Sequence, residues 1–347
     1  MTSIFIFLSG AALLVYSAER LIGSLVGVSR GLRISVFLLA VIFTGIEFDD
    51  IVLGVALNLE GDQDVALGLV LGTAVSFSGI VLALGAILTP TQFEIPRDYL
   101  VMFAVAPLIL LVVALREEVT TVDAIMLLGV FAAWIAYVAV REMRRETVTF
   151  RNLEIVEEMT EDDDEQDGGT SDPLRSQAVS TMSVFDKQGR YSGAINLGLA
   201  LLALCGVIVG AATVSAGTDQ ILDRYGIEGT VFGATIVTAV LCIEDLFLTV
   251  QPIRKGVPEI GIGNVIGSLV FSVTGKLGIV VLAGGTIAIG SNVLRWHLPA
   301  LVGLTGLAAY FLFTGQLKRW HGYALLALYV GYWIVSFGVY GGAPVDD

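Results

Sequence analysis

Apolar residues run along this chain in ten long stretches, most of which have the length of about 17 to 25 residues that crosses a bilayer core. The stretches recur from one end of the sequence to the other, so we predict an all-α membrane protein with ten transmembrane helices. Their expected ranges are 2–18, 35–58, 65–88, 99–115, 122–140, 192–216, 230–252, 259–288, 295–315 and 322–340.

The composition agrees with this class. Hydrophobic residues make up 55% of the chain and charged residues only 15%, and the mean hydropathy is +0.83, which lies outside the balance of soluble domains. No phosphate-binding loop, dinucleotide fingerprint or nucleophile motif accompanies the apolar stretches. We therefore expect a protein that is not an enzyme, carries no cofactor and binds no nucleic acid.

One long polar segment, residues 141–191, separates the fifth stretch from the sixth. It contains EMTEDDDEQDGGTSD and few large apolar residues, a composition typical of a disordered loop. The expected organisation is a first five-helix half at 1–140, an acidic loop at 141–191 and a second five-helix half at 192–347.

The basic residues are distributed unequally between the two ends of the predicted helices. One side carries seven basic residues in the central loop, together with Arg20, Arg30, Arg33, Arg97, Arg254, Lys255, Lys318 and Arg319. The opposite side carries only Arg116, Arg224 and Arg295. The positive-inside rule then predicts a multi-pass protein of the cell membrane with a cytoplasmic central loop and both termini outside.

The two halves repeat each other at a constant offset of 195 residues, without a gap. GIEFDD at 45–50 falls on VLCIED at 240–245, which aligns Asp49 with Glu244 and Asp50 with Asp245. DVALGLVLGTAVSF at 64–77 falls on EIGIGNVIGSLVFS at 259–272. Because each half has an odd number of predicted spans, the halves would be inverted repeats, whose substrate site in transporters lies near the bilayer midplane. The repeated regions are 35–88 and 230–288.

Carboxylates inside apolar spans are costly, at about 2.5–3.5 kcal/mol each on insertion scales, and indicate function or a buried partner. Asp50 and Asp245 fit a site for a hard cation such as calcium, or for a proton, since carboxylate oxygens serve both. Glu47 lies on the same helical face as Asp50 and is a candidate third carboxylate. Asp49 and Glu244 are either further ligands or neighbours that tune the charge. A purely structural pairing of these acids remains the alternative.

Lys276 is a second charged residue deep inside an apolar stretch. Ser268, Ser272 and Lys276 are spaced by four, which predicts one shared face on the eighth span, and Thr73 belongs to the corresponding face of the third. The hydroxyls of Thr73 and Ser268 are candidate neutral ligands. Lys276 is either a tethered cation that competes with an ion or one half of a structural ion pair.

These residues give the chain a resemblance to the calcium/cation antiporter superfamily and, within it, to the sodium/calcium exchangers, as a divergent member. GNVIGSLVF at 263–271 is similar to the family's G-N-x-x-G-S-N-x-F segment, and GLVLGTAVSF at 68–77 is a weaker copy. The resemblance implies alternating-access antiport of calcium against sodium or protons. It assigns the ion-binding glutamates of the family to Asp50 and Asp245, its serine to Thr73 and Ser268, and its later polar ligand to Ser272 in the second half.

The family's G-T-S-x-P-E motif is rewritten here as GIEFDD and VLCIED. The sodium-binding threonine and serine are lost in both halves, and the first half offers Phe77 where the family has a polar ligand. We therefore expect exchange of Ca²⁺ or another cation against Na⁺ or H⁺, with inorganic cations and the lipid bilayer as partners. The alternative is a degenerate, non-transporting membrane sensor or interaction protein.

Overall fold

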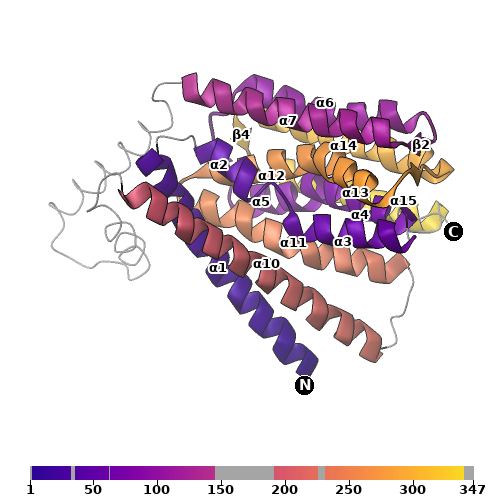
Figure 1. The fold of residues 1–347 in the computed structure, drawn as a ribbon, viewed down its shortest axis with the longest axis horizontal. Coiled ribbons are helices and arrows are strands. Elements are labelled where there is room, and N and C mark those ends of the chain that lie inside the picture. Colours follow the sequence, from indigo (N-terminus) through magenta and orange to yellow (C-terminus); the bar gives the residue numbers. More distant parts are fainter. Residues whose placement is uncertain (1, 33–35, 62, 145–190, 226–230, 340–347) are drawn as a thin grey trace.

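The structure is a computed structural model that describes residues 2–32, 36–61, 63–144, 191–225 and 231–339 (Figure 1). It is all-helical apart from four two-residue strands, as the apolar pattern predicts. The helices of the first half are α1 (Thr2–Leu32), α2 (Val36–Phe43), α3 (Phe48–Glu60), α4 (Gln63–Ser76), α5 (Leu82–Leu88), α6 (Arg97–Ala114) and α7 (Thr121–Arg144). Those of the second half are α10 (Tyr191–Tyr225), α11 (Val231–Arg254), α12 (Pro258–Val270), α13 (Leu277–Gly284), α14 (Leu298–Phe313) and α15 (Arg319–Val339).

Within the described residues, seven helical stretches are long and apolar enough to cross a membrane, and a shorter apolar helix covers Ile195–Gly210. The chain is therefore a multi-pass membrane protein. The predicted central loop lies outside the described residues except for 141–144 and residue 191, and so does the C-terminal end beyond residue 339.

The predicted span 35–58 is not one helix, which corrects the sequence-based expectation. α2 ends at Phe43 and α3 begins only at Phe48. At the break, the hydroxyl of Thr44 donates to the carbonyl of Ala40 (2.8 Å), and the amide of Gly45 donates to the same carbonyl (3.1 Å). Glu47 then occupies the N-cap position of α3, with a non-helical backbone (φ −82°, ψ 86°). In the second half, α11 continues through Glu244 and Asp245 without a break.

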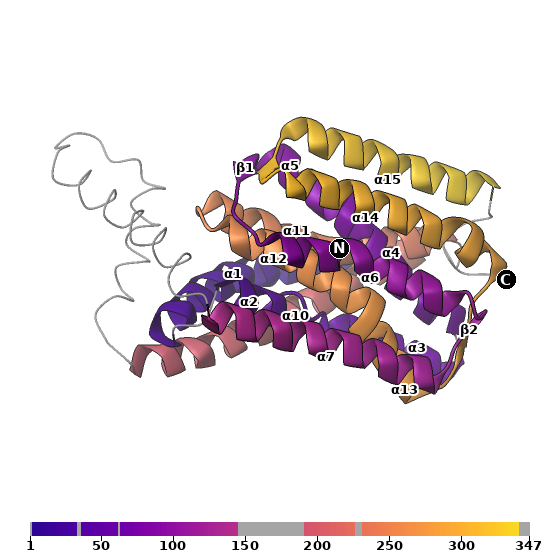
Figure 2. The ribbon, with the colours of Figure 1, turned by 90° about the horizontal axis from the view of Figure 1, so that it is seen from above.

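Two short antiparallel ribbons connect the halves. β1 (Thr91–Gln92) pairs with β4 (Gln316–Leu317), and β2 (Glu118–Val119) pairs with β3 (Ile287–Ala288). α6 runs from β1 to β2, whereas α14 runs from β3 to β4, so these two helices pack antiparallel with one ribbon at each end. The outer helices also pack across the two halves. α15 of the second half packs on α5 of the first, and α7 of the first half packs on α13 of the second (Figure 2).

The two central stretches each contain a π-helical segment at the same place in the repeat. α4 and α5 are joined by η1 (Phe77–Val81), and α12 and α13 are joined by η2 (Phe271–Lys276). π segments widen a helix locally and occur frequently at functional sites. A third, η3 (Val293–His297), precedes α14. Every residue of η2 is buried, which places the lysine at its end inside the protein.

α1 and α10 pack along each other beside the rest of the helices (Figure 1). Small residues allow this approach: a Cβ on Gly206 would lie 2.4 Å from the hydroxyl of Ser17, and one on Gly210 would lie 2.7 Å from the backbone nitrogen of Leu14. The middle of α10 closes one side of the site described next, through Leu204 and Ile208.

Candidate cation site

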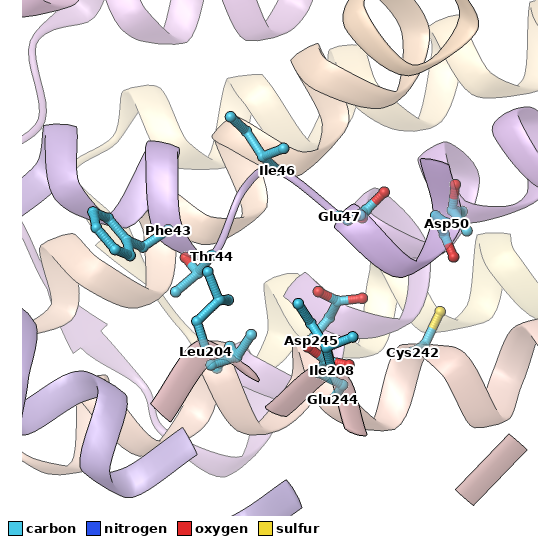
Figure 3. Close-up of a pocket in the computed structure, with 12 residues that line it drawn as sticks. Phe43, Thr44, Ile46, Glu47, Asp50, Leu204, Ile208, Cys242, Glu244 and Asp245 are labelled. Atoms are coloured by element: carbon cyan, nitrogen blue, oxygen red, sulfur yellow. The ribbon is translucent and has the colours of Figure 1, made fainter. Parts of the chain in front are cut away.

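Acidic residues from both halves line one pocket between the α2–α3 break and α11 (Figure 3). The first half contributes Glu47 and Asp50, and the second half contributes Glu244 and Asp245. Figure 3 shows the two pairs projecting into the same space from different elements. The full lining is Phe43, Thr44, Ile46, Glu47, Asp50, Thr73, Leu204, Ile208, Cys242, Glu244, Asp245 and Leu248. Four of the sequence-predicted acids, two from each half, therefore line the same pocket.

Lys276 reaches this site from the end of η2 and is fully buried. Its amino group contacts the carboxylate of Glu47 and donates to Asp50 Oδ2 at 2.5 Å. It also donates to Thr73 Oγ1 at 3.0 Å. The lysine is thus shared by two carboxylates of the first half, where the sequence predicted a pairing with one acid.

Two hydroxyl groups complete this cluster. Thr73 donates its own hydrogen to the carbonyl of Leu69 (2.9 Å), so its oxygen presents a lone pair to the ammonium of Lys276. Ser272 donates to Glu47 Oε2 at 3.1 Å. A buried charge is tolerated only when it is paired and hydrogen-bonded. Glu47 and Lys276 each have an ion-pair partner and a hydroxyl partner, and Asp50 is paired with and hydrogen-bonded to Lys276.

The two acidic pairs differ in burial. Glu47 and Asp50 are 8% and 4% exposed, whereas Glu244 and Asp245 are only partly buried. The helix break explains part of this difference, because it turns Glu47 inward at the start of α3. Asp50 follows in the first turn of that helix, where the helix dipole favours an anion. In the described part of the chain, the ammonium of Lys276 lies against the first-half acids.

The acids on α11 are held in position from α12. Asn264 donates to the backbone carbonyl of Asp245 (3.4 Å) and to the hydroxyl of Thr249 (3.2 Å). Both α11 and α12 are thereby fixed at the level of the pocket. Asn264 is fully buried and has the structural role that an amide between two helices usually plays.

The predicted ligand Ser268 is not among the described contacts of Lys276. Ser268 is fully buried, and its hydroxyl has no hydrogen-bond partner among the described residues. Asp49 belongs to α3 by its backbone, but its side chain lies outside the described residues. In the described part of the chain, no cluster of three His, Cys, Asp or Glu side chains has the arrangement of a metal site. The metal ligands predicted at Asp50 and Asp245 thus stay a prediction.

Cys242 and Thr44 line the pocket, although neither was predicted to be a site residue. The repeat carried a usable signal for Cys242, since the offset aligns it with Glu47. Thr44 had no such signal. Its place depends on the helix break, which itself depends on packing between distant parts of the chain.

The model of the family described as sodium/calcium exchanger protein matches residues 2–140 and 195–338 of this chain. The chain belongs to this family. Those of its relatives that are named as sodium/calcium exchangers are transporters of cations and not enzymes. Membership agrees with the resemblance carried by the two repeated motifs.

Individual relatives are distant. The sodium/calcium exchanger MaX1 of Methanosarcina acetivorans is 28% identical over 138 residues, which cover 40% of this chain and 39% of MaX1. The inner membrane protein YrbG of Escherichia coli is 24% identical over 283 residues, or 78% of this chain and 76% of YrbG. A solved structure of the sodium-calcium exchanger NCX_Mj, soaked with Na⁺ and Ca²⁺, matches with a TM-score of 0.74, 19% identity and 98% coverage of both chains. That similarity establishes the shared fold.

Proposed function

We propose that this protein is a secondary-active antiporter that exchanges Ca²⁺ or another cation against Na⁺ or H⁺ by alternating access. The observation that carries the proposal is the single pocket lined by Glu47 and Asp50 from one half and by Glu244 and Asp245 from the other. Competing cations that share a few carboxylates are the chemical basis of antiport, because only one set can be bound at a time.

Alternating access is supported by the internal symmetry of the chain. β1 after α5 pairs with β4 after α14, and β3 after α13 pairs with β2 after α6, so the elements exchange roles between the halves. The π segments η1 and η2 also correspond under the offset of 195 residues. We infer ten spans in two inverted five-helix repeats, with the exchange site between them.

We assign the core of the cation site to Asp50 and Asp245, which the repeat aligns. Glu47, Thr73, Ser268 and Ser272 supply further oxygens, and of these residues Glu47 and Thr73 line the pocket. Lys276, Asp49 and Glu244 adjust the charge of the site. The set is rich in carboxylates and poor in neutral oxygens, which favours a divalent cation or a proton over sodium alone.

Flux through proteoliposomes tests the proposal. Tracer uptake of Ca²⁺ is measured under an imposed Na⁺ or H⁺ gradient for the parent, Asp50→Asn and Asp245→Asn. Both substitutions remove a charge with little change of shape, so each is expected to reduce uptake by at least about tenfold. Asp64→Asn serves as the matched control, because Asp64 is an exposed acid in the first turn of α4. Transport by both pocket variants at the parent rate under every gradient would refute the site assignment.

One observation favours a second candidate, a non-transporting sensor or interaction protein. Lys276 already neutralises carboxylates that a mobile ion would otherwise bind. A sensor must still bind its cation, and binding to the folded state raises thermal stability. A parent that is stabilised by Ca²⁺ or Na⁺ but moves neither ion would support the sensor, whereas gradient-driven flux excludes it.

A further inference from the structure

Lys276 is a cation that the chain itself inserts among oxygen atoms of the first half. Its described contacts go to Glu47, Asp50 and Thr73, and none of them comes from the second half. The ammonium is surrounded by two carboxylates and the lone pair of one hydroxyl. A small monovalent cation would be coordinated by the same groups. The ammonium therefore has the environment of a bound ion.

The repeat gives this ion pair between the halves no charged counterpart. The offset of 195 residues aligns Lys276 with Val81 and Glu47 with Cys242. Val81 and Cys242 are buried, as are their charged counterparts. The acid of the first half and the base of the second half are thus aligned with a thiol and an apolar side chain.

We propose that Lys276 is a tethered cation that permanently holds Glu47, Thr73 and the Oδ2 atom of Asp50, so that mobile cations are left with Asp245 and the second carboxylate oxygen of Asp50. This inference rests on the proposed exchange function. Because the ammonium is attached to η2, no gradient can exchange it for a free ion. The site then carries one positive charge fewer per cycle than the same oxygens would carry without the lysine.

The inference predicts that a mobile cation can replace the ammonium once the lysine is removed. Lys276→Met keeps the approximate volume but leaves Glu47 and Asp50 without their cation. Its thermal unfolding is followed in NaCl, in CaCl₂ and in choline chloride at equal ionic strength, next to the parent. The variant is expected to unfold at a lower temperature in choline, and to be stabilised by Na⁺ or Ca²⁺ at concentrations at least about tenfold lower than the parent requires.

Three further variants separate this effect from general destabilisation. Lys276→Arg keeps the charge, so it should retain the cation response of the parent. Glu47→Gln combined with Lys276→Met removes one acid and one base, and should lose most of the new cation response. Lys318→Met removes a lysine that is exposed at the end of β4, and should leave the response unchanged.

Every outcome of the Lys276→Met measurement decides the proposal. A cation response equal to that of the parent overturns it. A variant that fails to fold in choline, Na⁺ and Ca²⁺ alike also overturns it, because a mobile ion should then have taken the place of the ammonium. Folding that requires Na⁺ or Ca²⁺ supports it.

The measurement is independent of transport, so the two proposals can fail separately. A parent that moves no cation refutes antiport while the gained cation response still stands. If the parent does transport, the charge moved per cycle follows from the membrane voltage at which net flux vanishes. That charge should be larger by one elementary charge in Lys276→Met, and an unchanged value contradicts the tethered cation.

Discussion

Gly45 and Gly267 lie backbone to backbone, with no room for a side chain between them. A Cβ on Gly45 would lie 2.9 Å from the Cα of Gly267 and 2.6 Å from the carbonyl oxygen of Val41. This contact holds the α2–α3 break against α12, and Glu47 follows only two residues later. The position of the first-half carboxylates thus depends on close packing between two glycines that are not part of the ion-binding site.

Gly45→Ala is expected to destabilise the protein by about 1–3 kcal/mol, the usual cost of forcing atoms into a filled interior. The free energy of unfolding in detergent micelles provides the measurement. Gly303→Ala is the matched control, since a Cβ there meets no atom within 4 Å. Alanine favours a helix over glycine by up to about 1 kcal/mol, so the control should be neutral or stabilising. Equal losses in both variants would contradict the packing argument.

Glu47→Gln and Asp50→Asn are expected to be strongly non-additive. Either single substitution leaves Lys276 with one carboxylate, whereas the double variant leaves a buried ammonium with none. Removing the partner of a buried charge costs about 3–5 kcal/mol, so the double variant should lose more than the sum of the singles. A double-mutant cycle in choline chloride measures this difference. The exposed pair Glu60→Gln and Asp64→Asn should be additive, and additivity at the site would mean that the two acids do not share the lysine.

Asn58→Ala is expected to weaken the link between α3 and α13. The amide of Asn58 donates to the carbonyl of Val280 (2.9 Å) and to that of Gly285 (3.2 Å). Losing a buried donor leaves these acceptors unpaired, at a cost of about 1–3 kcal/mol. The free energy of unfolding of Asn58→Ala is compared with that of Gln92→Ala, which removes an exposed amide. A loss no greater than that of the control would show that the two hydrogen bonds contribute nothing.

Much of the fold could be predicted from hydropathy alone. The predicted spans 99–115 and 122–140 correspond to α6 at Arg97–Ala114 and α7 at Thr121–Arg144. These helices face lipid on one side, so their apolar length is set by the bilayer. The break at residues 44–47 is not visible in the hydropathy pattern. It arises because Gly45 must approach Gly267, a residue more than two hundred positions away.

The residues of the site could be predicted from the sequence, but the contacts between them could not. The repeat selected Asp50 and Asp245, and hydropathy selected Lys276. Simple α-helical spacing, however, placed Ser268, Ser272 and Lys276 on one face, and the π segment η2 changes that geometry. Ser272 and Lys276 both contact Glu47, while Ser268 has no hydrogen-bond partner in the described part of the chain. A local change of helical winding is decided by tertiary packing, which the sequence pattern does not encode.

The expected orientation in the membrane predicts that the two ribbons lie on opposite sides of the bilayer. Lys318 follows β4 and Arg116 precedes β2, at opposite ends of α6 and α14, and both are exposed. The positive-inside rule places Lys318 in the cytoplasm and Arg116 outside. In intact cells, a membrane-impermeant maleimide should label Arg116→Cys but not Lys318→Cys, with the parent giving the background from its own two cysteines. Labelling of Lys318→Cys but not of Arg116→Cys would show that the protein has the opposite orientation in the membrane.

The central claim is that this pocket exchanges one cation for another, and the dependence of uptake on the opposite ion tests it most directly. Proteoliposomes are loaded with Na⁺, with acidic choline buffer or with neutral choline buffer, and tracer Ca²⁺ uptake is measured in each at a clamped membrane voltage. The account predicts uptake only where Na⁺ or H⁺ inside can leave in exchange, and its loss in Asp50→Asn. Equal uptake in all three loadings, or none with any of them, would contradict it.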